Sequence, residues 1–418
     1  MQSTQPSFWR ATPGVWVIAL GIASIVPATG SSQLAGMVTG SPAMQAARLR
    51  VDAARARLGA AGKFPDPRVE GMASRASNSM EGSWPKYEAR LQQPLPKAGE
   101  RGADKDRARA AVAMAEADFA MMAGEMAADT MMAVAEAEAA NAKAALLDAQ
   151  IERIQQVLAS VEARIASGQG RVADRLALQS RAASMRLMAG KERLMAKDSQ
   201  CDARARLGLA PKQPLPAFAI PDIARVTHEG SPAARQAIAK SDEAAAMLKM
   251  ARASAKPMTA IGIQASRELM PTGNEDMVGI ALMMEIPWNS RRYARADEAA
   301  AAADQAAASA DNDVAGFKLE AAIARVDRAA RLAGTARRLA TETSARLDAE
   351  YAGLVRAAAA SGAMGADSTV LMILEILEKQ ADTQWQVIEA DAAHRAAAAD
   401  LWKYTTLIAP PTATPDRT

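Results

Sequence analysis

The sequence predicts a mainly helical protein built from two copies of one unit, each with a pair of β-strands and a long helical hairpin. Three observations favour this fold class. The motif Gly40-Ser41-Pro42-Ala43 recurs 190 positions later as Gly230-Ser231-Pro232-Ala233, which indicates an internal duplication. Two runs without proline, from Pro96 to about Ser167 and from about 289 to 360, are long enough for helices of about 100 Å. Short segments with period-two alternation precede both runs.

The order of these features divides the chain. Residues 1–30 are expected to be a signal peptide, because Arg10 precedes the apolar stretch 15–26 and small residues follow it. A retained N-terminal anchor is the alternative. The first repeat then spans 31–208, a proline-rich linker 209–222, the second repeat 223–406 and a disordered tail 407–418. Ser41 and Pro42 are suited to begin a helix, which Gly62 and Pro65 would end.

Two pairs of strands are expected at equivalent places, 67–77 with 87–95 and 258–267 with 277–286. A polar loop containing Gly82 and Trp84 would join the first pair. Apolar residues fall on one face of the strands, at the length and period of strands that cross a membrane. A half-buried hairpin of a soluble domain is the alternative for each pair. The residues expected to face lipid are Leu91, Leu95, Val278, Ile280, Leu282 and Ile286, with Trp84 and Trp288 as interface anchors.

Four strands cannot close a barrel, and an open sheet edge in lipid would leave backbone groups without partners. Several chains would therefore have to pool their strands, and three copies would supply twelve. The long runs also carry apolar residues seven apart, such as Ile154 with Val161 and Leu332 with Leu339. This spacing predicts coiled-coil packing between neighbouring helices.

Composition argues against several classes of function. The net charge is only +3, and no basic patch with interleaved aromatics suggests nucleic-acid binding. His228 and His394 are isolated in sequence, and no nucleophile motif or phosphate-binding loop occurs, so we expect no enzyme, no metal site and no cofactor. Cys201 is the only cysteine and is expected to be a small buried residue. The 23 methionines are better explained as flexible filling of a core poor in aromatics than as metal ligands.

Several segments together resemble the TolC-like family of outer-membrane efflux proteins. Around the strands the similar residues are Pro65-Asp66-Pro67, Gln93-Pro94-Leu95-Pro96, Val278-Gly279-Ile280, Ile286-Pro287 and Arg291-Arg292. At the expected hairpin tip they are Arg164, Gly168, Val172, Asp174, Leu176 and Gln179. The resemblance covers about 40–406, and the order and duplication of the motifs are more specific than any one of them.

This resemblance implies a homotrimer with a twelve-stranded β-barrel in the lipid of the outer membrane and a twelve-helix α-barrel across the periplasm. The function it implies is a passive exit duct for substrates that an inner-membrane pump of the RND type delivers through a periplasmic adaptor. Heavy-metal cations are the expected cargo, because the short chain without a lipidated cysteine is similar to metal-efflux members. Asp367 and Glu375 are the candidates for a pore constriction. The adaptor would dock at the hairpin tips, at Gly168, Gly170, Val172, Asp174, Leu176, Gly362, Gly365, Ser368 and Leu371.

Two other functions remain open at this point. A periplasmic adaptor is also built from long helical hairpins, but it would not carry duplicated strand pairs. A coiled-coil scaffold without a pore would not require alternating apolar faces at two equivalent positions.

Overall fold

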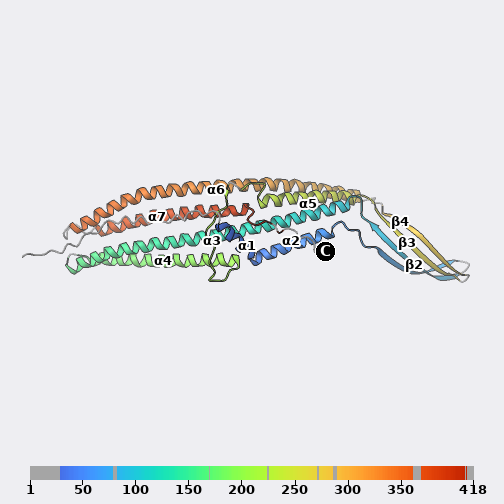
Figure 1. Cartoon of the computed structure of the whole chain (residues 1–418), viewed down its shortest axis with the longest axis horizontal. Coiled ribbons are helices and arrows are strands. Elements are labelled where there is room, and N and C mark those ends of the chain that lie inside the picture. Colours follow the sequence, from blue (N-terminus) through green and yellow to red (C-terminus); the bar gives the residue numbers. More distant parts are fainter. Residues whose placement is uncertain are drawn as a thin grey trace, which may run out of the picture.

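The computed structural model describes residues 29–78, 82–168, 170–223, 226–270, 273–285, 290–360, 369–409 and 411. The molecule is long and narrow, with a β-sheet at one end and the tips of helical hairpins at the other (Figure 1). Most of it is helical, and the only sheet in the described part is small and antiparallel, as the sequence predicts. Most of the predicted signal peptide, 1–28, lies outside the described residues.

The sheet contains four strands in the order β1-β2-β3-β4: β1 (Arg68–Asn78), β2 (Gly82–Leu95), β3 (Met258–Met270) and β4 (Gly273–Glu285). All neighbours are antiparallel, and β2 pairs with β3, so the strand pairs of the two repeats join into one sheet. The strands extend beyond the predicted ranges. Gly82 and Trp84 belong to β2 rather than to a loop, because Trp84 pairs across the ladder with Ala76.

Each repeat contributes a short helix, a very long helix and a returning helix. The long helices are α3 (Glu100–Ala166) and α6 (Ser290–Ala360), and the returning helices are α4 (Val172–Leu207) and α7 (Thr369–Asp400). The short helices α2 (Pro42–Ala60) and α5 (Pro232–Ser254) begin as predicted, with the Ser41 and Ser231 hydroxyls accepting hydrogen bonds from backbone N–H groups three residues later. Two elements were not predicted, α1 (Thr29–Gly40) and the 3₁₀ helix η2 (Leu401–Tyr404).

The short helices continue the returning helices end to end. Helix α4 ends at Gly208, whose φ of 67° is left-handed, and a Cβ there would lie 2.8 Å from Cδ of Pro42 at the start of α2. In the second repeat the Thr406 hydroxyl, just after η2, donates to the Gly230 carbonyl just before α5, at 3.2 Å. Each repeat therefore forms one continuous rod and one rod in two pieces, and Figure 1 shows both arrangements.

The four rods lie side by side in a defined order. Helix α3 contacts α4 and α2 on one side and α7 and α5 on the other, while α6 contacts α7 and α5. The layer therefore has two outer edges, α4 with α2 and α6, as Figure 1 also shows. Strand β1 follows α2, and β4 precedes α6. The two edges of the helical layer thus continue into the two edges of the sheet.

The packing between rods changes along their length. Near the sheet, buried alanines recur every seven residues, as in Ala103, Ala110 and Ala117 of α3. Toward the tips, larger residues such as Leu147, Ile154 and Val161 take over the same spacing in a buried cluster. Alanine seams need close approach of helices, whereas branched residues hold them further apart. Leu332 and Leu339 of α6, the second pair seven apart, are 61% and 53% exposed in this single chain.

Three further points concern the predictions from sequence. Cys201 is exposed, so the expectation that it is buried is wrong. Leu407 and Ile408 pack against the central cluster around Met131, so the first residues of the predicted disordered tail are ordered. Among the described residues, no helix has both the length and the apolar character needed to cross a membrane.

Candidate functional site

The sheet presents one face of exposed apolar side chains. Alternation and cross-strand register place Leu91 and Leu95 of β2 on the same face as Val278, Ile280 and Leu282 of β4. The three β4 side chains are 77%, 86% and 70% exposed. The predicted sharing of one face is therefore correct for these five residues, and Ile286 lies outside the described residues. A monomeric soluble protein rarely exposes so large a contiguous apolar surface.

The opposite face of the sheet is polar and carries paired charges. Lys86 Nζ lies 2.9 Å from an oxygen of Glu88 and 3.0 Å from an oxygen of Glu268, while Arg90 donates to Gln264 at 3.2 Å. Trp84 belongs to this polar face: it is 7% exposed, and its indole N–H donates to Glu268 at 3.3 Å. Its predicted role as an anchor in lipid is therefore wrong, because its ring is buried on the other side of the sheet. Trp288 lies outside the described residues.

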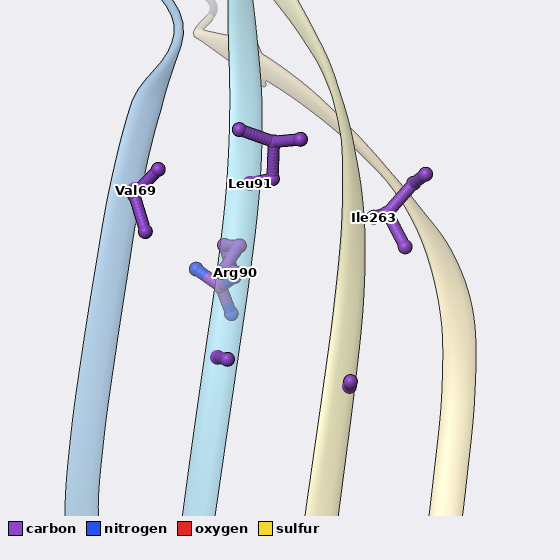
Figure 2. A pocket seen from close by; sticks show the side chains of 6 residues that line it. Val69, Arg90, Leu91 and Ile263 are labelled. Atoms are coloured by element: carbon purple, nitrogen blue, oxygen red, sulfur yellow. The ribbon is translucent and has the colours of Figure 1, made fainter.

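A shallow hollow crosses the apolar face and is lined by Val69, Ala89, Leu91, Ile263 and Ala265, with Arg90 at its base (Figure 2). It arises because Ala89 pairs with Gly71 and Ala265, so a row of small residues runs beside the larger Leu91 and Ile263. A binding site for a small molecule usually has several convergent polar groups, which this hollow lacks. We therefore interpret the hollow as an irregularity of the apolar surface and not as a ligand-binding pocket.

The apolar face is bounded by polar groups at both ends. Toward the hairpin loops, Arg267 and Asp276 on the same face form a two-point ion pair, with Nε 2.6 Å from Oδ1. Toward the helices, Lys97 follows β2 and Lys256 precedes β3. About ten residues separate these boundaries, or about 33 Å along a strand, which a tilt of about 40° reduces to about 25 Å. That height matches the apolar band of membrane β-barrels.

The sheet is open on both sides. Strands β1 and β4 each pair along one side only, within the part of the chain that the structure describes. Their free N–H and C=O groups are ready to pair with another strand. The apolar face and the open edges therefore occur in the same small sheet.

The tip of the first hairpin, between α3 and α4, is shaped by glycines. Gly168 has a φ of 79°, and a Cβ at Gly170 would lie 2.6 Å from the backbone nitrogen of Ile165, so both residues are required by the turn. Val172 and Leu176 on the first turns of α4 are 51% and 56% exposed. Asp174 lies in the first turn of α4, where a carboxylate favours the helix dipole.

The tip of the second hairpin is described only on the α7 side. Gly362, Gly365, Asp367 and Ser368 lie outside the described residues, while Leu371 is 60% exposed. Glu375 is paired with Lys379 one turn later at 2.7 Å, and this hydrogen bond lowers the pKa of its carboxyl group. Its charge is therefore compensated within the helix, and its place in a constriction stays a prediction.

Catalytic chemistry finds no support in the described residues. No group of three or more His, Cys, Asp or Glu side chains is arranged to hold a metal ion in the part that the structure describes. His394 is half-buried on α7, where burial and nearby arginines lower its pKa, and the carboxylate of Asp391 near it is already paired with Arg337 at 2.7 Å.

Comparisons with known proteins agree with this geometry. A family model described as outer membrane efflux protein matches residues 38–210, which cover most of the first repeat. The fold is similar to that of the outer-membrane channel OprN (TM-score 0.69, 18% identity, 90% of each chain). It is also similar to VceC of Vibrio cholerae (0.70, 15%, 90% of this chain and 96% of that chain) and to CusC (0.66, 17%, 91% and 92%). No curated protein sequence matches the chain.

The resemblance to the outer-membrane efflux family is confirmed. The family match rests on the first repeat, and the structural likeness extends the efflux-channel fold over both repeats. OprN is described as an outer-membrane channel, and the work on CusC concerns transmembrane channel formation. Sequence reasoning found the strands and the tip glycines, but its strand ranges ended one residue short of Lys86 and of Glu268, so it missed the ion pair that these residues form between β2 and β3.

Proposed function

We propose that this chain is the outer-membrane channel of a tripartite efflux system. In this proposal three copies pool their strands into a twelve-stranded barrel in the outer membrane and their rods into a twelve-helix barrel across the periplasm. The observation that carries the proposal is the sheet itself, with one exposed apolar face about 25 Å high, one polar face and two open edges.

Ring closure follows from the order of the elements. One edge of the chain consists of α4, α2 and β1, and the other of α6 and β4. Joining unlike edges of successive copies pairs β1 with the next β4 and places α4 against the next α6. A contact between unlike surfaces forms a closed ring when the rotation between successive copies closes after a whole number of copies, here three. The polar face, with Lys86 and Glu88, then lines the lumen.

The partners we propose are a periplasmic adaptor and an inner-membrane pump of the RND type, so that substrates pass through the channel passively. The adaptor would contact the tips, where Val172, Leu176 and Leu371 are exposed apolar residues at the end of long rods. Gly168 and Gly170 keep the turn compact enough for close approach. As constriction residues we retain Asp367 and Glu375.

The cargo that we propose to test first is heavy-metal cations, on the resemblance of the chain to metal-efflux members. Deletion of the chain, followed by a panel of metal and drug susceptibilities, tests this directly. Increased sensitivity to copper, silver or zinc alone would support it. Increased sensitivity restricted to organic drugs would contradict the cargo and leave the channel proposal intact.

The ring itself is tested by a cross-link between unlike edges. Cys201 lies 29 residues, or about 44 Å, from the tip end of α4, which is the N-terminus of that helix. Leu332 lies 28 residues, or about 42 Å, from the tip end of α6, which is its C-terminus. The two residues are therefore at about the same height along the rods. Both are exposed in the single chain. We expect Leu332→Cys, treated with a short bismaleimide in outer-membrane fractions, to give linked dimers and trimers on denaturing gels.

Two control variants make this result specific. Wild type has only Cys201, and the double variant Leu332→Cys with Cys201→Ser has only the α6 thiol. In a ring of unlike edges neither should cross-link. Recovery of the protein as a freely soluble monomer, without heat-modifiable migration on gels, would refute the channel. Cross-linking of either single-cysteine control would refute the edge assignment.

A further inference from the structure

The strands meet the helices in a zone with a marked excess of positive charge. The segments 63–68, 96–109, 249–257 and 290–298 flank the helix-side ends of the four strands. They contain 13 basic and 6 acidic residues, a net charge of +7, whereas the whole chain carries only +3. The rest of the molecule is therefore slightly acidic, and the basic residues are concentrated at one level of the structure.

Two exposed aromatic residues lie at the same level. Phe64 precedes β1 and is 55% exposed, and Tyr293 in the first turn of α6 is 72% exposed. The guanidinium carbon of Arg101 lies 4.1 Å from the centre of the Phe64 ring. Exposed aromatic rings combined with basic side chains are typical of a membrane–water boundary.

The lysines and arginines of this zone differ in whether they already have partners within the chain. Lys97 and Lys256 donate to the backbone carbonyls of Ser254 and Ala98, at 2.7 and 2.9 Å, and so fasten the start of α3 to the end of α5. Lys63, Lys105 and Arg292 are exposed, and within the described residues they make no side-chain hydrogen bond or ion pair. These three are therefore available to a partner outside the chain.

We propose that this basic collar, Lys63, Lys97, Arg101, Lys105, Lys256 and Arg292, binds anionic phospholipid headgroups at the periplasmic surface of the membrane. The inference rests on the proposed function, which places the adjoining apolar band in lipid. Headgroup phosphates then lie at the level where the band ends. Clustered Lys and Arg beside a membrane segment attract anionic lipid. Charge complementarity thus selects phosphatidylglycerol-type lipids over zwitterionic ones.

The test measures which lipid the trimer retains. Full-length protein is reconstituted into vesicles of equal parts phosphatidylcholine and phosphatidylglycerol, released with mild detergent, and analysed for bound lipid by mass spectrometry. We expect wild type to retain phosphatidylglycerol at least about threefold over phosphatidylcholine in low salt. In about 1 M salt, where the screening length falls to about 3 Å, the preference should disappear.

A triple variant, Lys63→Gln with Lys105→Gln and Arg292→Gln, removes the three unpaired cations of the collar without touching the two lysines that fasten the fold. We expect its lipid preference to fall close to unity. The matched control is Lys191→Gln with Lys197→Gln, two exposed lysines in the middle of α4, and it should behave as wild type. An unchanged preference in the triple variant would overturn the proposal.

Failure of this inference can be separated from failure of the channel. If wild type inserts and migrates as a heat-modifiable trimer but shows no preference for phosphatidylglycerol, only the collar proposal is refuted. Wild type that never enters vesicles refutes the proposed function and the collar with it. If the triple variant does not assemble, the salt dependence measured on wild type still decides the question.

Discussion

Replacing Ile280 by arginine separates a lipid-facing sheet from an ordinary soluble hairpin. The Ile280 side chain is 86% exposed in the single chain and belongs to no core cluster. On a soluble surface, Ile280→Arg would change the free energy of unfolding by no more than about 0.5 kcal/mol. If Ile280 faces lipid, the same substitution lowers the free energy of unfolding much more, because arginine at the middle of the bilayer destabilises a membrane β-barrel by about 2–4 kcal/mol.

The structure places Ile280 near the middle of the apolar band. Asp276 lies four residues away toward the loops and Glu285 five residues away toward the helices, about 13 and 17 Å along the strand. The full cost at the bilayer centre therefore applies. We expect Ile280→Arg to lower the free energy of unfolding by about 2–4 kcal/mol per chain.

The neighbouring residue supplies a matched control. Gly279 lies at the same depth on the polar face, opposite Gln264, and a Cβ there would meet no atom within 4 Å. We expect Gly279→Arg to change stability by less than about 1 kcal/mol, because its side chain would enter the aqueous lumen. Denaturant titration of protein refolded in vesicles, read by heat-modifiable migration, gives both values. Equal effects of the two substitutions would refute the orientation of the sheet.

Three further outcomes can be checked by thermal unfolding. Gly124→Ala should destabilise the fold by about 1–3 kcal/mol, because its Cβ would lie 2.5 Å from the Trp402 carbonyl oxygen. The control Gly190→Ala places its Cβ in open space and should be neutral or slightly stabilising. Ile154→Ala should cost about 2–5 kcal/mol, since Ile154 is fully buried in the seam near the tips, and a smaller loss would contradict that packing. His394 has a pKa lowered by burial and by nearby arginines, so the stability it contributes is full above pH 6.5 and is lost as pH falls toward its folded pKa. Wild type should therefore lose more stability between pH 7.5 and 5.5 than His394→Gln, and an identical pH dependence would remove His394 from this role.

The elements with strong local signals were predicted from sequence. Ser41 caps a helix as expected, Ser231 of the repeated motif does the same, and Gly168 turns the chain where the glycine cluster indicated. These signals depend on a few neighbouring residues, which is why they can be recognised without a structure. Helix α1 was missed because only Leu34 and Val38 are fully buried, and its small residues follow directly after an apolar stretch that resembles a signal peptide.

Features that depend on distant contacts could not be predicted in the same way. Trp84 was assigned to a loop because residues 82–86, which include a glycine and a proline, lack the apolar alternation that begins at Tyr87, yet they pair with β1 in the sheet. Cys201 was expected in a core because cysteines are commonly buried, but it lies on an outer edge of the helical layer. The order of the rods also depends on which alanine faces approach each other, and the alanine-rich sequence gives those faces almost identical patterns.

The interrupted rods have a mechanical consequence. At the joints between α4 and α2 and between α7 and α5, the helices abut without continuous backbone hydrogen bonds. Such a joint resists compression along the axis but opposes bending and tension only weakly. A displacement imposed at the tips would therefore reach the sheet through α3 and α6, while the jointed rods would flex at their midpoints.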